Sequence, residues 1–356
     1  MIYPALFAVL ILVRFVLARA PELRDQFYWV VLAGLFVFSA FRLEVGCDWW
    51  GYYKHFSLQY DLQMADALVR RDPLWWVLVQ TIGALGLSYP WLNVASSALF
   101  FGGIHILART QPDRLGFLIL LYPVLILNMP MSGIRQAAAI GLLAAAFVSF
   151  QRGNPLSYAL RVVIGAGFHS STAAFLLLVP LVGKSHPRLR LFSTAILLVP
   201  GLVLLTTGQD AQLAISRYVN TGVDAQGALY RAGMLFLTGL LFVLALRKPW
   251  TQTFPPDRRL VGFGALMMLA TLPLASLSSV IGDRLGYFLV PLQAIILARL
   301  PFLPLGSARP ILSALPYLAL LLMLSVWALR SFHFGYCYLP YDTWLFGLPD
   351  RYRSPL

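Results

Sequence analysis

Charged residues are scarce in this chain of 356 residues: only 12% are Asp, Glu, Lys or Arg, whereas 59% are hydrophobic. A soluble domain carries about 25% charged residues, because its surface must face water. The composition therefore excludes a soluble globular protein. Apolar runs long enough to cross a hydrocarbon core of ~30 Å recur from end to end, so one signal peptide or one anchor does not explain them.

Cysteine is almost absent, with Cys47 and Cys337 as its two occurrences. They are far apart in sequence, form no CxxC pair and stand at no metal-ligand spacing from a histidine. We therefore expect neither a zinc site nor a disulfide framework. The two cysteines do not indicate whether the protein lies in an oxidising or a reducing compartment. Acidic residues are also few, 14 against 27 Lys and Arg. In a membrane protein this excess first indicates cytoplasmic loops beside anionic lipid.

The apolar runs predict an all-α polytopic membrane protein with about twelve transmembrane helices in a single domain, residues 1–356. The expected spans lie near Ile2–Ala18, Phe27–Phe41, Asn93–Ala108, Leu115–Asn128, Ile134–Phe150, Leu156–Phe168, Ser171–Gly183, Leu191–Thr207, Leu229–Leu246, Val261–Ser279, Leu285–Arg299 and Ile311–Leu329. We find no internal repeat and no low-complexity linker.

Short loops rich in Lys and Arg are usually cytoplasmic, and such loops recur here at alternate connections. They contain Arg19 and Arg24, Arg109 and Arg114, Arg152, Lys184 to Arg190, Arg247 to Arg259, and Arg299 with Arg309. This alternation places both termini outside. It holds only if the segment at about 48–90, which includes the apolar run 74–87, makes no net crossing. We expect that segment to be interfacial or re-entrant on the outer face.

Several ionisable residues then fall at the outer ends of helices, against the positive-inside trend. They are Arg42, Glu44, Asp48, Lys54, Arg135, His169, Arg217, Arg231, Asp283 and Arg284. Insertion of an ionisable side chain into the membrane costs about 2.5–3.5 kcal/mol of free energy on insertion scales. The presence of such a residue therefore indicates that it has a binding partner or a functional role. An anionic substrate at the outer surface would be such a partner. For any single arginine, snorkelling or an internal salt bridge is an equal alternative.

Three outer segments carry most of this chemistry. Residues 41–56 combine carboxylates, cations and aromatic rings, which hold sugars by face contact and hydrogen bonds, although an interfacial aromatic belt has the same composition. Residues 128–136 open a helix at which Arg135 and backbone N–H groups favour a phosphate, whereas simple capping by Ser132 is the structural alternative. Residues 165–171 place His169 among small residues, where it is a base or a structural histidine.

These three segments resemble the EpsG family of bacterial polysaccharide polymerases, which is related in kind to the Wzy polymerases. The resemblance rests on Arg42 with Gly46-x-Asp48-x-x-x-Tyr52, on Ile134-Arg135-Gln136 before an alanine-rich helix, and on Phe168-His169-x-Ser171. Gly282-Asp283-Arg284-Leu285-x-x-Tyr287 and Tyr338-Leu339-Pro340-Tyr341 extend it toward the C-terminus. Cys47, the Trp49-Trp50 pair and Tyr53 depart from the family pattern.

The resemblance implies a GT-C-like membrane glycosyltransferase. It would act on glycan repeat units carried by undecaprenyl diphosphate, at the outer face of the bacterial inner membrane, in exopolysaccharide or O-antigen biosynthesis. The expected partners are this lipid-linked oligosaccharide, the bilayer and a chain-length regulator of the polysaccharide co-polymerase type, without nucleic acid. A diphosphate is a good leaving group that needs only cations to stabilise its charge, so we expect no cofactor and no metal.

The predicted roles follow this chemistry. Asp48 is the first candidate for the base that activates the acceptor hydroxyl, with Glu44 and His169 as alternatives. The diphosphate would contact arginines, whose planar fork suits phosphate oxygens. These are Arg42, Arg135, Arg284, Arg217 and Arg231. The glycan would contact Trp49, Trp50, Tyr52, Tyr53, Gln136 and Asp283, unless Asp283 instead orients Arg284.

Two alternatives use the same residues. An O-antigen ligase or another lipid-carrier glycosyltransferase would differ in its acceptor. A flippase or exporter of lipid-linked sugars would line a path with the arginines, but charges through the full depth of the bilayer would then be expected. A membrane O-acyltransferase has weaker support still.

Overall fold

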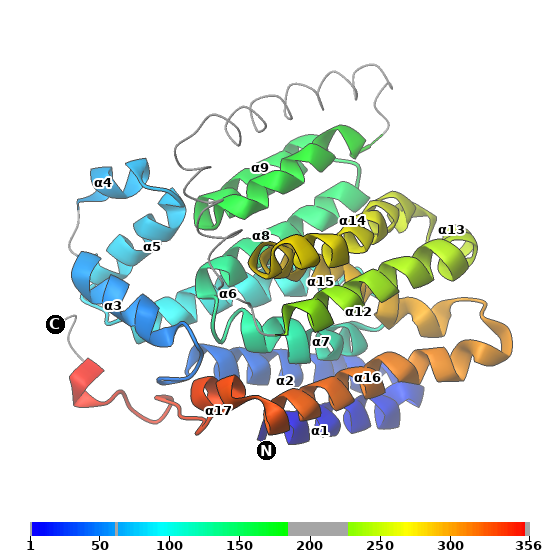
Figure 1. Ribbon diagram of the computed structural model, residues 1–356, viewed down its shortest axis with the longest axis horizontal. Coiled ribbons are helices and arrows are strands. Elements are labelled where there is room, and N and C mark those ends of the chain that lie inside the picture. Colours follow the sequence, from blue (N-terminus) through cyan, green and yellow to red (C-terminus); the bar gives the residue numbers. More distant parts are fainter. Residues whose placement is uncertain (1, 61–62, 184–226, 353–356) are drawn as a thin grey trace. The chain divides into compact units, whose positions relative to one another are not determined.

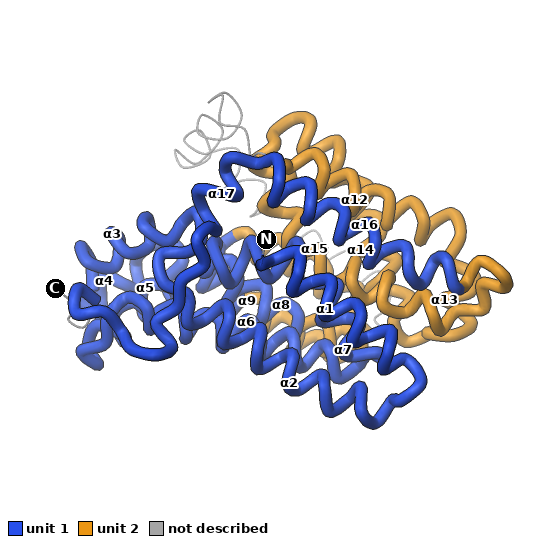
Figure 2. Tube along the Cα trace, turned by 90° about the horizontal axis from the view of Figure 1, so that it is seen from below, with its two compact units in different colours: residues 1–145, 164–170, 310–356 blue, residues 146–163, 171–309 orange. Residues whose placement is uncertain are grey.

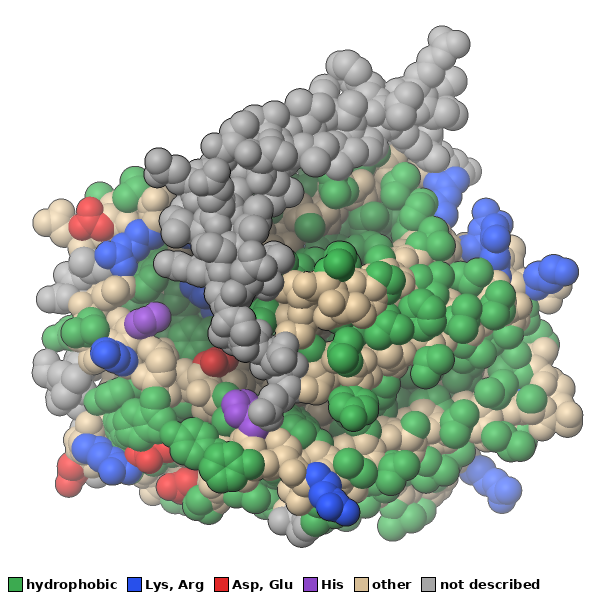
Figure 3. All heavy atoms as spheres, in the orientation of Figure 1, with side chains coloured by type: hydrophobic (Ala, Val, Ile, Leu, Met, Phe, Trp, Pro, Cys, Tyr) green, Lys and Arg blue, Asp and Glu red, His purple; other side chains and the backbone are tan. Residues whose placement is uncertain are grey.

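The computed structural model describes residues 2–60, 63–183 and 227–352, and these form helices joined by short loops (Figure 1). Within these ranges the only pairing of β type is an isolated bridge between Arg42 and Thr343. Helices satisfy their backbone hydrogen bonds internally, as a chain in lipid must. Hydrophobic side chains cover much of the face drawn in Figure 3. The prediction of an all-α polytopic membrane protein is thus confirmed.

The chain divides into two compact units (Figure 2). Unit 1 comprises residues 1–145, 164–170 and 310–356, and unit 2 comprises residues 146–163 and 171–309. We describe each unit by itself. This division leaves the prediction of a single membrane domain untested.

Unit 1 contains most of the N-terminal helices and, of the described residues, the last two α-helices. These are α1 (Ile2–Val16), α2 (Pro21–Ala40), α3 (Trp49–Gln59), α4 (Met64–Val69), α5 (Pro73–Ala84), α6 (Pro90–Ala108), α7 (Arg114–Leu121) with the π-helical η2 (Tyr122–Ile126), the first part of α8 (Ile134–Gln151), α16 (Arg309–Arg330) and α17 (Phe332–Tyr338). α2, α5 and α6 each begin with proline, which loses no hydrogen bond there because the first helical N–H has no partner in any case.

Glycine allows α6 and α8 to approach at backbone distance within unit 1. A Cβ atom added at Gly103 would lie 1.8 Å from the carbonyl oxygen of Gly141, and one at Gly141 would lie 2.3 Å from that of Leu99. Small residues at helix contacts are typical of membrane proteins, where packing and not the hydrophobic effect holds helices together. This contact fixes the start of α8 relative to the preceding helices.

Unit 2 contains the end of α8, α9 (Pro155–Phe168), the 3₁₀ segment η3 (Ser170–Leu181), α12 (Ala228–Leu241) with η4 (Phe242–Leu246), α13 (Arg247–Thr253), α14 (Arg258–Leu277) and α15 (Ser279–Arg299). Both α9 and η3 have residues in unit 1 at the connection between them. α12, α14 and α15 pack on one another. The Thr271 hydroxyl donates to the Ala232 carbonyl, and the Gln293 amide donates to the Thr238 hydroxyl at 2.9 Å.

Seven helical segments in the described ranges are long and apolar enough to cross a bilayer, and each lies on a predicted span. They contain α1, α6, α8, α12, α14, α15 and α16. The segments Arg114–Ile126, Pro155–Phe168 and Ser170–Leu181 are shorter apolar helices. In α2, three charged residues within the first five positions, Glu22, Arg24 and Asp25, shorten the apolar run. The predicted span Leu191–Thr207 lies outside the described residues, so the total of twelve stays a prediction.

The segment at 48–90 folds into three short helices, α3, α4 and α5, of 11, 6 and 12 residues. A helix of 12 residues is about 18 Å long, well short of a hydrocarbon core of ~30 Å. None of the three is long enough to cross a bilayer by itself, and the interfacial or re-entrant location of the segment stays a prediction.

The loops of unit 1 are joined by two separate groups of polar contacts, one at each end of its helices. At one end the pairs are Cys47 with Cys337, Asp48 with Ser132 and Arg135 with Asp72. At the other end Asp113 pairs with both Arg14 and Arg24. The first group contains residues from loops predicted to be outside. In the second, Arg24 and Asp113 come from loops predicted to be cytoplasmic, and Arg14 lies within the predicted span Ile2–Ala18. The side of the membrane that each end faces stays a prediction.

Candidate active site

A tight approach at Gly46 brings the loop after α2 against the turn that precedes α8. Gly46 has φ +109°, and a Cβ atom there would lie 1.8 Å from the carbonyl oxygen of Met131. Only glycine combines this backbone conformation with this space. The first two predicted segments, residues 41–56 and 128–136, therefore meet at this end of unit 1.

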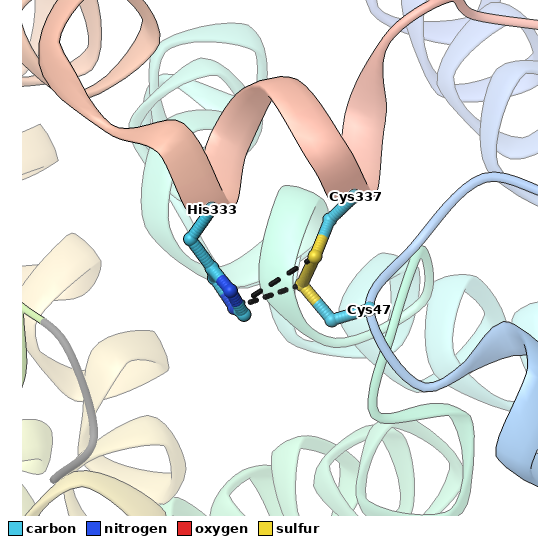
Figure 4. Close-up of side chains that lie close together, drawn as sticks. All are labelled: Cys47, His333 and Cys337. Atoms are coloured by element: carbon cyan, nitrogen blue, oxygen red, sulfur yellow. Dashed lines mark hydrogen bonds between the residues drawn. A yellow bond between two sulfur atoms is a disulfide. The ribbon is translucent and has the colours of Figure 1, made fainter.

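A disulfide between Cys47 and Cys337 ties the same loop to α17 (Figure 4). The two residues are 290 positions apart in sequence, with their Cα atoms 4.6 Å apart. The prediction that the sequence supports no disulfide was wrong, because the pairing depends on a long-range contact that cysteine spacing does not reveal. His333 points at the pair, with its Nε2 atom 3.2 Å from the Cys47 sulfur. Both sulfur atoms are bonded to each other, so the group offers no thiolate.

The Asp48 carboxylate is exposed and points toward the turn before α8. Its Oδ2 atom accepts a hydrogen bond of 3.2 Å from the Ser132 hydroxyl. The backbone N–H of Asp48 donates to the Oγ atom of Ser132 at 3.3 Å. Asp48 occupies the N-cap position of α3, yet its side chain does not cap that helix. The carboxylate is thus oriented by Ser132 and remains accessible to solvent.

Arg135, in the first turn of α8, is linked to the His169 segment through a carboxylate that the sequence motifs do not include. Its Nη1 atom lies 3.2 Å from Oδ2 of Asp72, and Oδ1 of Asp72 accepts a hydrogen bond of 2.7 Å from the backbone N–H of Ser170. Asp72 has φ +60° and directly precedes Pro73 at the start of α5. An Asp before a proline that opens a helix is a recognisable sequence signal. This signal does not indicate that Asp72 pairs with Arg135.

The third predicted segment also packs against α5. A Cβ atom on Gly167 would lie 2.6 Å from Cγ of Leu74, so the small residues before His169 do permit close approach. His169 itself is buried and precedes Ser170, the residue held by Asp72. The structure therefore brings Asp48, Arg135 and His169 to one end of unit 1.

Arg42 is fully buried, and each of its three guanidinium nitrogens donates to a protein oxygen. The acceptors are the Val45 and Ser39 carbonyls at 2.9 and 2.7 Å and Oδ1 of Asn93 at 3.0 Å. Burial lowers the pKa of Arg42, and nearby tyrosines counteract that shift. Arg42 therefore holds the loop in place, and the predicted contact with diphosphate would require it to leave these oxygens.

Glu44 is held by the C-terminal segment. Its carboxylate pairs with the Arg351 guanidinium and accepts a hydrogen bond of 2.6 Å from the Tyr352 hydroxyl. The hydrogen bond to Glu44 and burial together raise the pKa of Tyr352, with burial the larger cause. A carboxylate with two such partners is a poorer candidate for a base than the more accessible Asp48.

The two tryptophans of α3 differ in exposure. Trp49 is 0% exposed, with Tyr53, Tyr89 and Tyr352 packed around its ring. Trp50 is 52% exposed. The structure thus places Trp49 in the core, whereas the ring of Trp50 is accessible to a ligand. Tyr52 and Tyr53 are half-buried, and Gln136 in α8 is buried.

Unit 2 holds the remaining predicted residues. Arg231 of α12 donates to Oδ1 of Asp283 in α15 at 2.6 Å and lies over the ring of Tyr287. Asp283 therefore pairs with Arg231, and its predicted contact with the glycan, or its alternative role in orienting Arg284, stays a prediction. Arg284 follows it on α15 with an exposed side chain. Arg217 lies outside the described residues.

A family model matches residues 26–343, which include the three segments 41–56, 128–136 and 165–171. The chain belongs to the EpsG family. The resemblance seen in the sequence is thereby confirmed over nearly the whole chain. No curated protein and no solved structure matches the chain significantly. Membership of the EpsG family suggests a function like that of a polysaccharide polymerase, and the site geometry is the basis for anything finer.

Proposed function

We propose that the chain is a membrane glycosyltransferase that transfers a growing polysaccharide from undecaprenyl diphosphate onto a lipid-linked repeat unit. Family membership supports the reaction class. One observation supports the site: Asp48 on Ser132 and Arg135 on Asp72 lie beside the same helix start, that of α8. A carboxylate and a guanidinium in this arrangement supply the two groups that the transfer needs.

Asp48 is the proposed base that accepts the proton of the acceptor hydroxyl as that oxygen attacks the anomeric carbon. The bond from this carbon to the diphosphate oxygen breaks, and the electron pair leaves with the diphosphate. Arg135 stabilises the charge that develops there, so no general acid and no metal are required. If Asp48 is not the base, His169 and then Glu44 are the next candidates. The exposed ring of Trp50, with Tyr52 and Tyr53, is the proposed surface for the acceptor sugar.

The residues of unit 2 are proposed to contribute further. Arg231, with Asp283 and Arg284 at the start of α15, would contact the diphosphate or glycan, and Arg217 would join them. We also propose the full set of twelve spans, the GT-C-like architecture and a co-polymerase partner that regulates chain length.

The disulfide supports an orientation with the site at the outer face of the bacterial inner membrane. Disulfides persist in oxidising compartments such as the periplasm and are rare in the cytoplasm. The loop with Cys47 and the end with Cys337 would then both face outward, which agrees with the alternation of basic loops. Cysteines introduced at positions 48 and 258 test this. An impermeant reagent should label position 48 and not position 258 in whole cells, and the reverse pattern would reject the orientation.

Glycan analysis of a deletion strain tests the reaction. Loss of the gene should leave single lipid-linked repeat units in place of long chains, and the purified protein should elongate such units without any other enzyme. Normal chains in the deletion strain, or a purified protein that only moves units across vesicles, would reject a polymerase.

A further inference from the structure

The turn that leads into α5 contains a second exposed arginine beside the proposed site. Nε and Nη2 of Arg71 both donate to the hydroxyl oxygen of Ser170, at 3.1 and 3.0 Å. One whole edge of a guanidinium is thus directed at a single neutral oxygen. A guanidinium edge with two parallel N–H groups matches the two oxygens of a phosphate or carboxylate far better than one hydroxyl.

Arg135 is linked to the same residue through Asp72. Asp72 pairs with Arg135 and accepts the backbone N–H of Ser170, while the side chain of Ser170 accepts from Arg71. One guanidinium comes from the first turn of α8 and the other from the bend before α5. The adjacent residues Arg71 and Asp72 both contact Ser170, so the two arginines are held near each other in unit 1.

The charges of this group do not balance. Arg71 and Arg135 carry two positive charges, and Asp72 supplies one negative charge. The Asp72 side chain is 4% exposed, so it is committed to its partners, whereas that of Arg135 is 32% exposed and Arg71 is exposed. Nε of Arg135 is buried and has no hydrogen-bond partner in the described part of the chain. The group therefore has an excess positive charge, and the exposed side chain of Arg71 makes it accessible to an anion.

We propose that Arg71 is a second diphosphate-binding residue that acts together with Arg135, and that Asp72 positions the two. The inference rests on the proposed function for the identity of the lipid, and it adds a residue that the sequence motifs did not indicate. In it, the Arg71 fork leaves the Ser170 hydroxyl for one phosphoryl group while Arg135 contacts the other. A diphosphate, which spans both guanidinium groups, should then bind better than a monophosphate.

Binding of undecaprenyl diphosphate and undecaprenyl monophosphate to the purified protein in nanodiscs of neutral lipid tests the proposal. Arg71→Gln should weaken diphosphate binding about 10- to 100-fold, as expected for a lost charge-assisted hydrogen-bonding group. It should weaken monophosphate binding much less. Arg71→Lys keeps the charge but not the planar guanidinium, so its affinity for the diphosphate should lie between those of the unmodified protein and Arg71→Gln. Competition with inorganic pyrophosphate separates recognition of the headgroup from insertion of the lipid chain.

Arg70 supplies the matched control. It adjoins Arg71, but it donates to the Gln59 side chain and lies over the ring of Trp76. Arg70→Gln should bind diphosphate like the unmodified protein. Equal binding by Arg70→Gln and Arg71→Gln, with loss in Arg135→Gln alone, would overturn the role of Arg71 and leave the proposed function intact. Failure of the unmodified protein both to bind undecaprenyl diphosphate and to elongate lipid-linked repeat units would instead reject the proposed function itself.

The positioning role of Asp72 has its own measurement. Asp72→Asn keeps the shape of the side chain but removes the charge that holds Arg135, so the KM for the lipid donor should rise while the KM for the acceptor stays constant. Asp72→Glu should restore part of the donor affinity. A lower kcat with both KM values unchanged would show only a smaller folded fraction, and would overturn the positioning role.

Discussion

Replacement of Asp48 by Asn is the most direct test of the proposed chemistry. Asn keeps the oxygen that accepts the hydrogen bond from Ser132 at 3.2 Å, but it cannot take a proton from the acceptor hydroxyl. The side chain of Asp48 is exposed and does not cap α3, so the substitution should change the melting temperature little. A fall in turnover would therefore report on chemistry and not on folding.

The loss of a general base typically lowers the chemical step by about 10²–10⁴-fold, and we expect Asp48→Asn to fall in this range. Ser132→Ala removes the hydrogen bond that orients the carboxylate, worth about 1 kcal/mol, together with the acceptor of the Asp48 backbone N–H, and should lower turnover by about 3- to 10-fold. Single-turnover elongation by purified protein, with donor binding measured in parallel, checks both values. If Asp48→Asn makes chains of normal length at a normal rate with donor binding intact, Asp48 is not the base.

Three further outcomes are expected. The native chain should react with no thiol reagent until it is reduced, because Cys47 and Cys337 are its only cysteines and are paired, and free thiols in the native protein would contradict the disulfide. Activity should survive EDTA, since the proposed site uses arginines, and a loss that magnesium or manganese restores would reject that mechanism. Gly46→Ala should lower the yield of folded protein, because its Cβ would lie 1.8 Å from the Met131 oxygen, whereas Gly51→Ala on α3 meets nothing within 4 Å and should be harmless.

The sequence could predict which segments lie together because residues at the same end of neighbouring helices must share a membrane level. Asp48, Arg135 and His169 each follow or precede an apolar run. Hydropathy and loop charge were therefore enough to predict that the three lie at the same end of their helices. The residues that pair with them could not be predicted from the sequence. Asp72 reaches Arg135 across 63 positions of sequence, and no local pattern specifies such a pair.

The exposure of individual rings and cations was also decided by tertiary packing. Trp49 and Phe56 are seven positions apart on α3 and share a buried face, so the helical period could have separated Trp49 from Trp50 before the structure was known. Arg42 is different. Its acceptor Asn93 belongs to α6, and only the packing of α6 against α2 turns a candidate phosphate ligand into a buried support.

The disulfide also sets an order of events during synthesis. Cys337 leaves the ribosome 290 residues after Cys47, so the loop that carries Asp48 stays untethered while the intervening helices are inserted. The covalent link can form only after α16 has been inserted and α17 has reached the compartment of Cys47. A chain halted before Cys337 would therefore lack this link, and the loop that carries Asp48 would be tethered only after α16 had been inserted.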